Sequence, residues 1–285
     1  MKKTLLSIGH GYSAQALASL IGLENWHIIG TTRSAEKAKQ LSHQGIEPLI
    51  WPTEQLWQAL VRADYVLCSV APDTSGCPVA LELGALMHKQ TFAPKWVGYL
   101  STTGVYGDHQ GAWVDEETPL NPSTVRGRQR LMAESQWQAL GLNLHIFRLA
   151  GIYGPDRGPF SKVRDGTARL IIKKNQIFSR IHVEDIAQSL ATSMAQPNAG
   201  AIYNLCDHAP CPPEDVIAHA AALLGLAHPP KVDYETANMT PMARSFYAES
   251  KRVSNKRMTQ ELGIKLRYPD YKAGLAALLA LEGLT

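Results

Sequence analysis

The chain has 285 residues, 45% of them hydrophobic and 19% charged, which is the composition of a globular protein with a sizeable core. Its formal net charge of +3 does not indicate a nucleic-acid partner, although it is compatible with an anionic small ligand. The apolar run after Met1-Lys2-Lys3 is too short for a signal peptide or a membrane span, so we expect a cytoplasmic protein without a membrane partner.

The first predicted unit, Thr4–Leu17, consists of a strand, a glycine turn and a helix. An apolar run, Leu5–Ile8, leads into two glycines, and Ala14 completes a G-x-G-x-x-A pattern before a helical stretch. Such a turn suits a dinucleotide pyrophosphate, because its backbone N–H groups approach the phosphates and the helix dipole faces them. We therefore predict that the following residues bind a dinucleotide cofactor: Gly9, His10, Gly11, Tyr12 and Ser13.

Strands and helices alternate through residue 149. We predict strands over 26–32, 47–51, 65–70, 96–101 and 144–149, and helices over 34–42, 53–61, 79–88 and 124–140. The run Tyr65–Val70 is almost entirely apolar, which is typical of a strand buried on both faces of a parallel sheet. The alternation predicts right-handed βαβ units and an α/β fold with a doubly wound parallel sheet of the Rossmann type.

Beyond Gly151 the alternation becomes irregular. We predict a helix over 160–174, a strand over 178–182, a helix over 183–195 and a strand over 201–206. Helices follow over 212–224, 254–262 and 269–281, with an irregular stretch over 229–249. We therefore expect a dinucleotide-binding domain over 1–153, to which 177–207 returns. A smaller, interleaved substrate lobe would comprise 154–176 and 208–285.

The end of the second predicted strand favours NADP over NAD. The sequence Thr31-Thr32-Arg33-Ser34 has no carboxylate for the 2′-hydroxyl of NAD. Arg33 offers a guanidinium for a 2′-phosphate, flanked by the hydroxyls of Thr32 and Ser34, unless it is simply a solvated residue at a helix entry. At the end of the fourth strand, we expect Val70 and Ala71 to face the adenine side of the cofactor.

Four segments resemble the motifs of extended short-chain dehydrogenases/reductases. In chain order they are Tyr99–Asp108 (YLSTTGVYGD), Arg148–Pro155 (RLAGIYGP), Arg180–Ala187 (RIHVEDIA) and Lys251–Gly263, which contains S-N-K and E-L-G. With the glycine turn they cover nearly the whole chain. The chain is therefore similar to the nucleoside-diphosphate-sugar epimerase/dehydratase group, and most similar to its atypical branch. This resemblance implies an NAD(P) cofactor and a nucleotide-sugar or a similar anionic substrate.

The resemblance also implies a Tyr–Lys pair, four residues apart on the helix after the fifth strand. This pair moves a proton while the nicotinamide takes or gives a hydride, and a Ser or Thr at the end of the strand binds the same oxygen. Thr102 holds that last position, directly after Ser101. On the helix, alignment on Glu134 places Arg130 at the Lys position and Arg126 at the Tyr position. Arg130 keeps a positive charge for the cofactor ribose, but Arg126 cannot act as a base because a guanidinium does not lose its proton.

Another base would then be needed for proton transfer. The candidates are Tyr106, Tyr153 and His182, although each belongs to a motif in which it can be structural. Arg126 either binds a carboxylate or phosphate of the substrate or remains solvated. The predicted catalytic residues are Thr102, Tyr106, Arg126 and Arg130; Ser101, Arg130 and Gly151 join the cofactor set; and the predicted substrate contacts are Arg126, Tyr153, Arg180 and Arg244.

Three hypotheses remain open for the function. The first is an oxidoreductase or epimerase with an altered catalytic pair, the second is a cofactor-binding sensor or scaffold, and the third is a sheet-based module that binds no nucleotide. Apolar side chains on Val79–Met87 and Thr124–Leu140 are compatible with a homodimer, although core packing explains the same pattern. The four cysteines have no C-x-x-C spacing, so we expect neither a zinc site nor a disulfide framework.

Overall fold

A seven-stranded parallel sheet lies at the centre of the structure, in the order β11-β7-β5-β4-β1-β2-β3. The computed structural model describes residues 2–88 and 92–283. The strands are β1 (Lys3–Ile8), β2 (Trp26–Thr32), β3 (Glu47–Ile50), β4 (Tyr65–Cys68), β5 (Trp96–Thr102), β7 (Leu144–Leu149) and β11 (Ile202–Leu205). The order proceeds outward from β1 in both directions, as in a doubly wound sheet. The predicted Rossmann-type α/β fold is confirmed.

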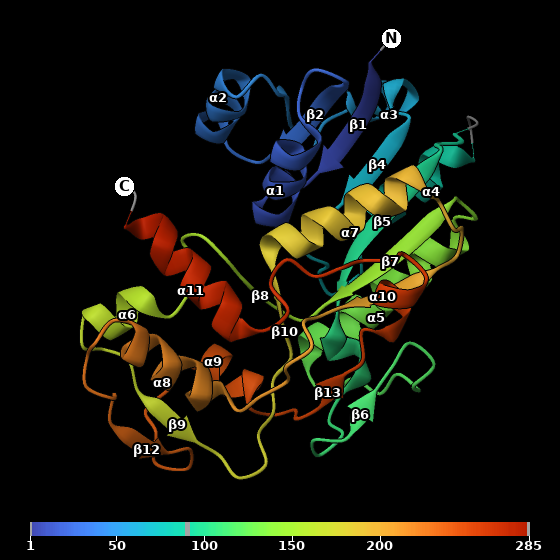
Figure 1. Cartoon of the computed structure of the whole chain (residues 1–285). Helices are drawn as coiled ribbons and strands as arrows, with labels where there is room; N and C mark the ends of the chain where they lie inside the picture. Colours follow the sequence, from blue (N-terminus) through green and yellow to red (C-terminus); the bar gives the residue numbers. More distant parts are fainter. Residues whose placement is uncertain (1, 89–91, 284–285) are drawn as a thin grey trace.

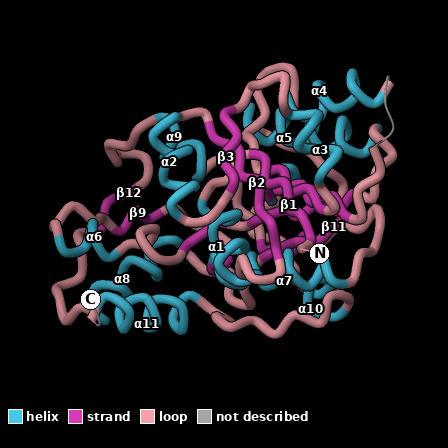
Figure 2. The backbone as a smooth tube through the Cα atoms, turned by 90° about the horizontal axis from the view of Figure 1, so that it is seen from above, coloured by secondary structure: helices cyan, strands magenta, loops and turns pink. Residues whose placement is uncertain are grey.

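Helices cover both faces of this sheet (Figures 1 and 2). On one face lie α1 (Tyr12–Ile21), α2 (Ala35–His43), α7 (Val183–Ala195) and α10 (Lys256–Gln260), whose apolar side chains share one core cluster. On the other face lie α3 (Leu56–Arg62), α4 (Pro78–Met87) and α5 (Val125–Ala139), which share a second cluster. All four residues of β4 are buried, as expected for a strand covered on both sides.

A second group of elements lies beside the sheet, at the lower left of Figure 1. It contains α6 (Phe160–Arg164), β9 (Leu170–Ile172), α8 (Pro213–Leu223), β12 (Lys231–Asp233), α9 (Pro241–Phe246) and α11 (Tyr271–Glu282). Phe160, Val216 and Leu275 belong to its core. Two further parallel pairs join segments distant in sequence: β8 (Gly151–Tyr153) with β10 (Arg180–His182), and β6 (Trp113–Val114) with β13 (Arg252–Val253).

The helix predicted over 160–174 is much shorter in the structure. It ends at Arg164, and Gly166 follows with a φ of +65°, a conformation that a helix cannot continue. The apolar residues Leu170–Ile172 then form β9, which pairs with β12. An apolar run of three residues fits either element, and here the distant partner strand determines the outcome.

Within the described part of the chain, no helix is both long and apolar enough to cross a membrane.

Candidate functional site

A cleft of about 790 Å³ opens at the carboxyl ends of the central strands. The turn after β1, the loop after β4 and the end of β5 form one side of it, and Arg157 and Arg180 lie on the other. In doubly wound sheets, ligands bind in the crevice where the strand order reverses, which here is between β1 and β4. The predicted site residues that line the cleft are Gly9, Gly11, Tyr12, Ser13, Ala71, Ser101, Thr102, Arg126, Arg130, Gly151, Tyr153 and Arg180.

The glycine turn after β1 is held against β2 and the loop after β4. The N–H of Gly9 donates to Thr31 Oγ1 at 2.8 Å, and the N–H of His10 donates to the Thr31 carbonyl at 3.0 Å. Gly9 has a φ of +78°, and a Cβ there would lie 3.0 Å from Val70 Cγ2 and 3.2 Å from Val70 N. Position 9 therefore requires glycine for both its conformation and its packing.

The first turn of α1 fits the pyrophosphate of a dinucleotide. Its N-cap, Gly11, makes no side-chain cap hydrogen bond, and the first turn contains no acidic residue. Free N–H groups and the positive end of the helix dipole can therefore face an anion without competition from a carboxylate. A Cβ at Gly11 would meet only the Gly9 carbonyl, at 3.6 Å, so the protein itself leaves room above this residue.

The other three residues predicted for this part of the site take different positions around the turn. His10 is buried beneath it, with Nδ1 3.0 Å from Ser7 Oγ, and burial lowers the pKa of its imidazole to about 4. Tyr12 lines the cleft and donates its hydroxyl to the Pro155 carbonyl at 2.8 Å, while burial raises the pKa of Tyr12 to about 12. Ser13 also lines the cleft. The side chain of His10 does not line it.

Arg33 is exposed at the end of β2, and no hydrogen bond or ion pair of its side chain is found with the residues that the structure describes. Ser34 caps α2 by accepting from the Lys37 N–H at 3.1 Å, as predicted, and Thr32 Oγ1 accepts from the Ser34 N–H at 3.3 Å. These three residues do not line the cleft itself. They follow Thr31, which holds the glycine turn.

Arg130 bridges the ends of two strands. Its Nη1 donates to Tyr99 Oη and the Leu100 carbonyl, both at 2.9 Å, and lies 3.4 Å from the Val70 carbonyl. The side chain of Val70 packs beneath Gly9 rather than in the cleft. Arg130 therefore places a fixed positive charge in the cleft while it ties β5 to the loop after β4.

Arg126 extends from α5 to α9. Its Nη2 donates to Ser245 Oγ at 3.1 Å, and the guanidinium lies 4.5 Å from the centroid of the Phe246 ring. Arg126 is exposed, and all three residues line the cleft. In this arrangement the Arg126 guanidinium contacts Ser245 and Phe246, two cleft-lining residues of α9.

The end of β5 places hydroxyl groups in the cleft. Thr102 Oγ1 accepts from the Gly104 N–H at 3.2 Å, and the hydroxyl of Ser101 donates to Glu134 Oε1. Tyr106 is fully buried and lies outside the cleft lining. Its hydroxyl donates to Asn204 Oδ1 at 2.8 Å, and burial raises its pKa to about 12. We therefore assign Tyr106 a structural role, because a substrate in the cleft does not reach it.

Of the other predicted substrate contacts, some line the cleft and some do not. Tyr153 lines the cleft, and burial, with nearby carboxylates, raises its pKa; Arg180 also lines it and donates to Cys211 Sγ at 3.1 Å. Arg244, on α9, instead donates to the Ala237 carbonyl at 2.8 Å, in the loop before this helix, and does not line the cleft. His182 is buried, and its Nδ1 caps α7 by accepting from the Glu184 N–H.

A buried ion pair that the sequence did not reveal also lines the cleft. Lys251 Nζ lies 2.7 Å from Glu249 Oε2 and donates to the Gly107 carbonyl at 2.7 Å, while the Ser123 hydroxyl donates to Glu249 Oε1 at 2.7 Å. Both ionised side chains are only 10% exposed. Lys251 begins one of the family-like segments, but it is 144 residues from Gly107, so no local pattern connects the two.

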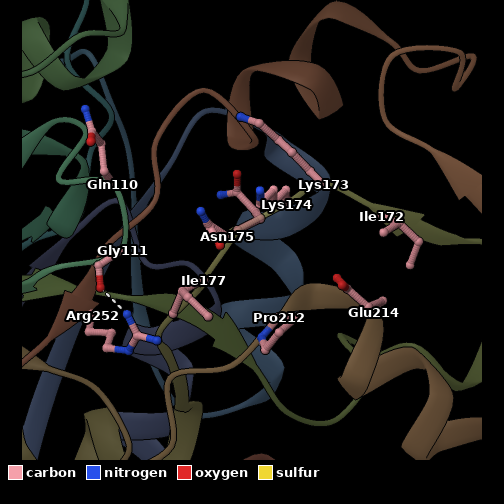
Figure 3. A pocket seen from close by; sticks show the side chains of 11 residues that line it. Gln110, Gly111, Ile172, Lys173, Lys174, Asn175, Ile177, Pro212, Glu214 and Arg252 are labelled. Atoms are coloured by element: carbon pink, nitrogen blue, oxygen red, sulfur yellow. Dashed lines mark hydrogen bonds between the residues drawn. The ribbon is translucent and has the colours of Figure 1, made fainter.

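A second cavity, of about 420 Å³, lies behind this part of the cleft wall (Figure 3). Arg252 lines it and donates to the Gly111 carbonyl, as the dashed line in Figure 3 indicates. Ile177 lines both the second cavity and the cleft, so the segment around it separates the two.

Neither a metal cluster nor a disulfide is found among the described residues. No group of three or more His, Cys, Asp or Glu side chains in these ranges could hold a metal ion. Cys68, Cys77, Cys206 and Cys211 are free and buried.

The sheet, the glycine turn and the cleft are those of a dinucleotide-binding α/β protein. A model of the NAD dependent epimerase/dehydratase family matches residues 9–206, and the chain belongs to this family. It is 56% identical to a conserved protein of unknown function from Silicibacter pomeroyi DSS, with a TM-score of 0.93 over 98% of this chain and 99% of that chain. It is also 29% identical to Protein YeeZ of Escherichia coli strain K12, over 95% of this chain and 97% of that protein.

Two more distant structures share the fold and contain nicotinamide cofactors. One is dTDP-glucose 4,6-dehydratase from Bacillus anthracis in complex with NAD, with 17% identity, a TM-score of 0.79 and coverage of 99% of this chain and 97% of that chain. The other is human epimerase family protein SDR39U1 with NADPH, with 18% identity, a TM-score of 0.75 and coverage of 97% and 99%. The family match and these neighbours support a nicotinamide cofactor for this chain.

Proposed function

We propose that this protein is an NADP(H)-dependent oxidoreductase or epimerase that acts on an anionic small molecule, such as a nucleotide-sugar. The glycine turn carries the proposal, because it leaves the N-terminus of α1 uncapped at a cleft that also contains Thr102 and Arg130. Gly9, Gly11 and Ser13 would hold the pyrophosphate, and Arg130 the nicotinamide ribose. A bound nicotinamide would take or give a hydride beside Thr102, whose hydroxyl would bind the reacting oxygen.

The charges that line the cleft support an anionic substrate. Arg126, Arg157, Arg180 and Lys251 all line it, whereas the single carboxylate in the described lining belongs to Glu249, which pairs with Lys251. Such a surplus of positive charge attracts a phosphate or carboxylate. The B. anthracis neighbour is a dehydratase of dTDP-glucose, which is one example of this substrate class.

A second candidate function is that of a cofactor sensor or scaffold. The observation that favours it is the contact of Arg126 with Ser245 and Phe246, because alignment on Glu134 would place this arginine at the expected Tyr position. A protein without proton-transfer chemistry could still bind NADPH and change its contacts in response.

The proposal is tested first by titration with NADPH, followed by its fluorescence. We expect saturable binding at micromolar cofactor; no binding would contradict both the enzyme and the sensor. The protein with bound NADPH is then scanned in single turnover over nucleotide-sugars and small carbonyl compounds, with absorbance read at the nicotinamide band. Oxidation by one class of compound identifies an enzyme, and none across the whole panel favours the sensor.

The preference for NADP is tested with Arg33→Ala. A charge-assisted contact to the 2′-phosphate contributes about 1.5–3 kcal/mol, so NADPH should bind roughly 10- to 100-fold more weakly. NADH binding should not change, because NADH lacks that phosphate. Lys39→Ala is the matched control, since it also removes one exposed positive charge near α2. An equal loss for both cofactors would refute the assignment of Arg33.

We also propose that the protein forms a homodimer through α4 and α5. These helices expose Leu81, Val125 and Met132, at 47%, 60% and 45% of their surfaces. We further propose a cytoplasmic location. The four free thiols fit a reducing compartment.

A further inference from the structure

The chain segment from Glu249 to Val253 alternates between two cavities. Glu249, Lys251 and Val253 line the cleft, and Arg252 lines the second cavity (Figure 3). Ser250, which also lies between them, donates its hydroxyl to the Asn175 carbonyl at 2.7 Å. Successive side chains of an extended segment point to opposite sides, so this segment directs Lys251 into the cleft.

One N–H group of the Lys251 ammonium is not used by the contacts found among the described residues. It carries three N–H groups, and two of them are taken by Glu249 Oε2 and the Gly107 carbonyl. For the third, no partner is found within the ranges that the structure describes. Glu249 is itself fixed, because its other oxygen accepts from the Ser123 hydroxyl. The result is a positioned donor at the wall of the cleft, and such a donor can act on an oxygen without reorganising first.

The two arginines of α5 that line the cleft, Arg126 and Arg130, already bind other elements. Arg130 Nη1 binds Tyr99 and Leu100, and Arg126 binds Ser245 and lies over Phe246. Both arginines are tied to other elements, although each guanidinium, like the Lys251 ammonium, has further N–H groups for which no partner is found within the described ranges. Lys251 differs in that its donor comes from the C-terminal part of the chain and is held by an ion pair.

We propose that Lys251, oriented by Glu249 and the Gly107 carbonyl, binds the reacting carbonyl or hydroxyl oxygen of the substrate. The substrate would be an oxo or hydroxy compound with a phosphate or carboxylate, because Arg157 and Arg180 line the same cleft. This inference rests on the proposed function. It adds to that proposal a second donor, besides the Thr102 hydroxyl, for the reacting oxygen.

Pyridoxal 5′-phosphate is a suitable probe, because it combines an aldehyde with a phosphate. The neutral amine of Lys251 attacks the aldehyde carbon, the carbonyl oxygen leaves as water, and an imine forms. Borohydride then adds a hydride to the imine carbon and leaves a stable secondary amine. The labelled lysine is identified by peptide mass spectrometry, with and without NADPH. Lys174, an exposed lysine beside the second cavity, is the internal control.

Pyridoxal closes to an internal hemiacetal and is therefore the less reactive aldehyde, so each lysine is described by the ratio of its labelling rate with pyridoxal 5′-phosphate to its rate with pyridoxal. We expect this ratio to be at least about tenfold higher at Lys251 than at Lys174. Glu249→Gln removes the ion-pair partner of Nζ and should accelerate the labelling of Lys251 further. Label on Lys174 but none on Lys251, in both the wild type and Glu249→Gln, would overturn the proposal. An equal ratio at Lys251 and Lys174 would overturn its anionic part.

The labelling does not depend on cofactor binding or turnover. A chain that binds no NADPH but is labelled at Lys251 would refute the proposed function and leave the Lys251 site supported. A chain that binds NADPH but is labelled only at exposed lysines would refute the Lys251 site alone. Lys251→Met, which keeps the length of the side chain, should abolish the label and leave NADPH affinity within about twofold of the wild type.

Discussion

Gly9→Ala is expected to weaken NADPH binding by at least tenfold, or about 1.4 kcal/mol. Two physical effects act together. An alanine at a φ of +78° costs roughly 1–2 kcal/mol, and its Cβ would lie 3.2 Å from Val70 N and 3.3 Å from the Ser69 carbonyl carbon. Because these are backbone atoms of the loop after β4, the turn itself must shift, and its N–H groups move away from the pyrophosphate. Fluorescence titration with NADPH measures the affinity, and thermal unfolding measures the stability.

Two matched glycine variants separate strain from cofactor contact. Gly22, at the end of α1, has a φ of +68°, and a Cβ there would meet no atom within 4 Å, so Gly22→Ala should lose stability but keep NADPH affinity. Gly11→Ala should instead keep stability but lose NADPH affinity. The backbone of Gly11 is extended, and a Cβ there meets only the Gly9 carbonyl, at 3.6 Å. If Gly11→Ala bound NADPH as tightly as the wild type, the pyrophosphate would not lie over this turn.

The sequence predicted the sheet well because each βαβ unit is a local pattern. The apolar run at Tyr65–Val70 and the cap at Ser34 depend on neighbouring residues. The structure has a buried strand over Tyr65–Cys68, two residues shorter than predicted, and Ser34 caps α2 as predicted. The predicted helix over 160–174 was wrong beyond Arg164, because a β12 strand some 60 residues away pairs with that segment. Local patterns do not contain that information.

Local sequence patterns also predicted part of the candidate site, namely the part whose residues are close together in the sequence. Gly9 and Gly11 are recognisable from their spacing, and the structure places both in the cleft. The Glu249–Lys251 pair was missed, because the contacts that hold it come from Ser123 and Gly107. Arg244 was expected at the substrate, but its guanidinium binds the carbonyl of Ala237 in the loop before α9. The motif identifies the cofactor side, whereas the substrate side depends on long-range contacts.

The buried Arg148–Glu134 pair should give the largest loss of stability. Arg148 Nη2 lies 2.8 Å from Glu134 Oε2, both side chains are at most 3% exposed, and Arg148 Nη1 donates to Tyr106 Oη at 3.0 Å. Ser101 donates to the same carboxylate, so the pair joins β5, α5 and β7 beneath the cleft. Breaking a buried pair costs about 3–5 kcal/mol, because the remaining charge has no ionic partner.

Arg148→Met should therefore lower the free energy of unfolding by about 3–5 kcal/mol, measured by urea denaturation. Methionine keeps much of the side-chain length, so the loss reports the unpaired Glu134 carboxylate rather than a large cavity. Adding Glu134→Leu should recover most of the loss, since apolar replacement of a whole buried ion pair is often neutral. If the double variant were as unstable as Arg148→Met, packing or the Tyr106 contact would account for the effect instead of the unpaired charge. A loss below about 1 kcal/mol in Arg148→Met would mean that water or Ser101 already compensates the carboxylate.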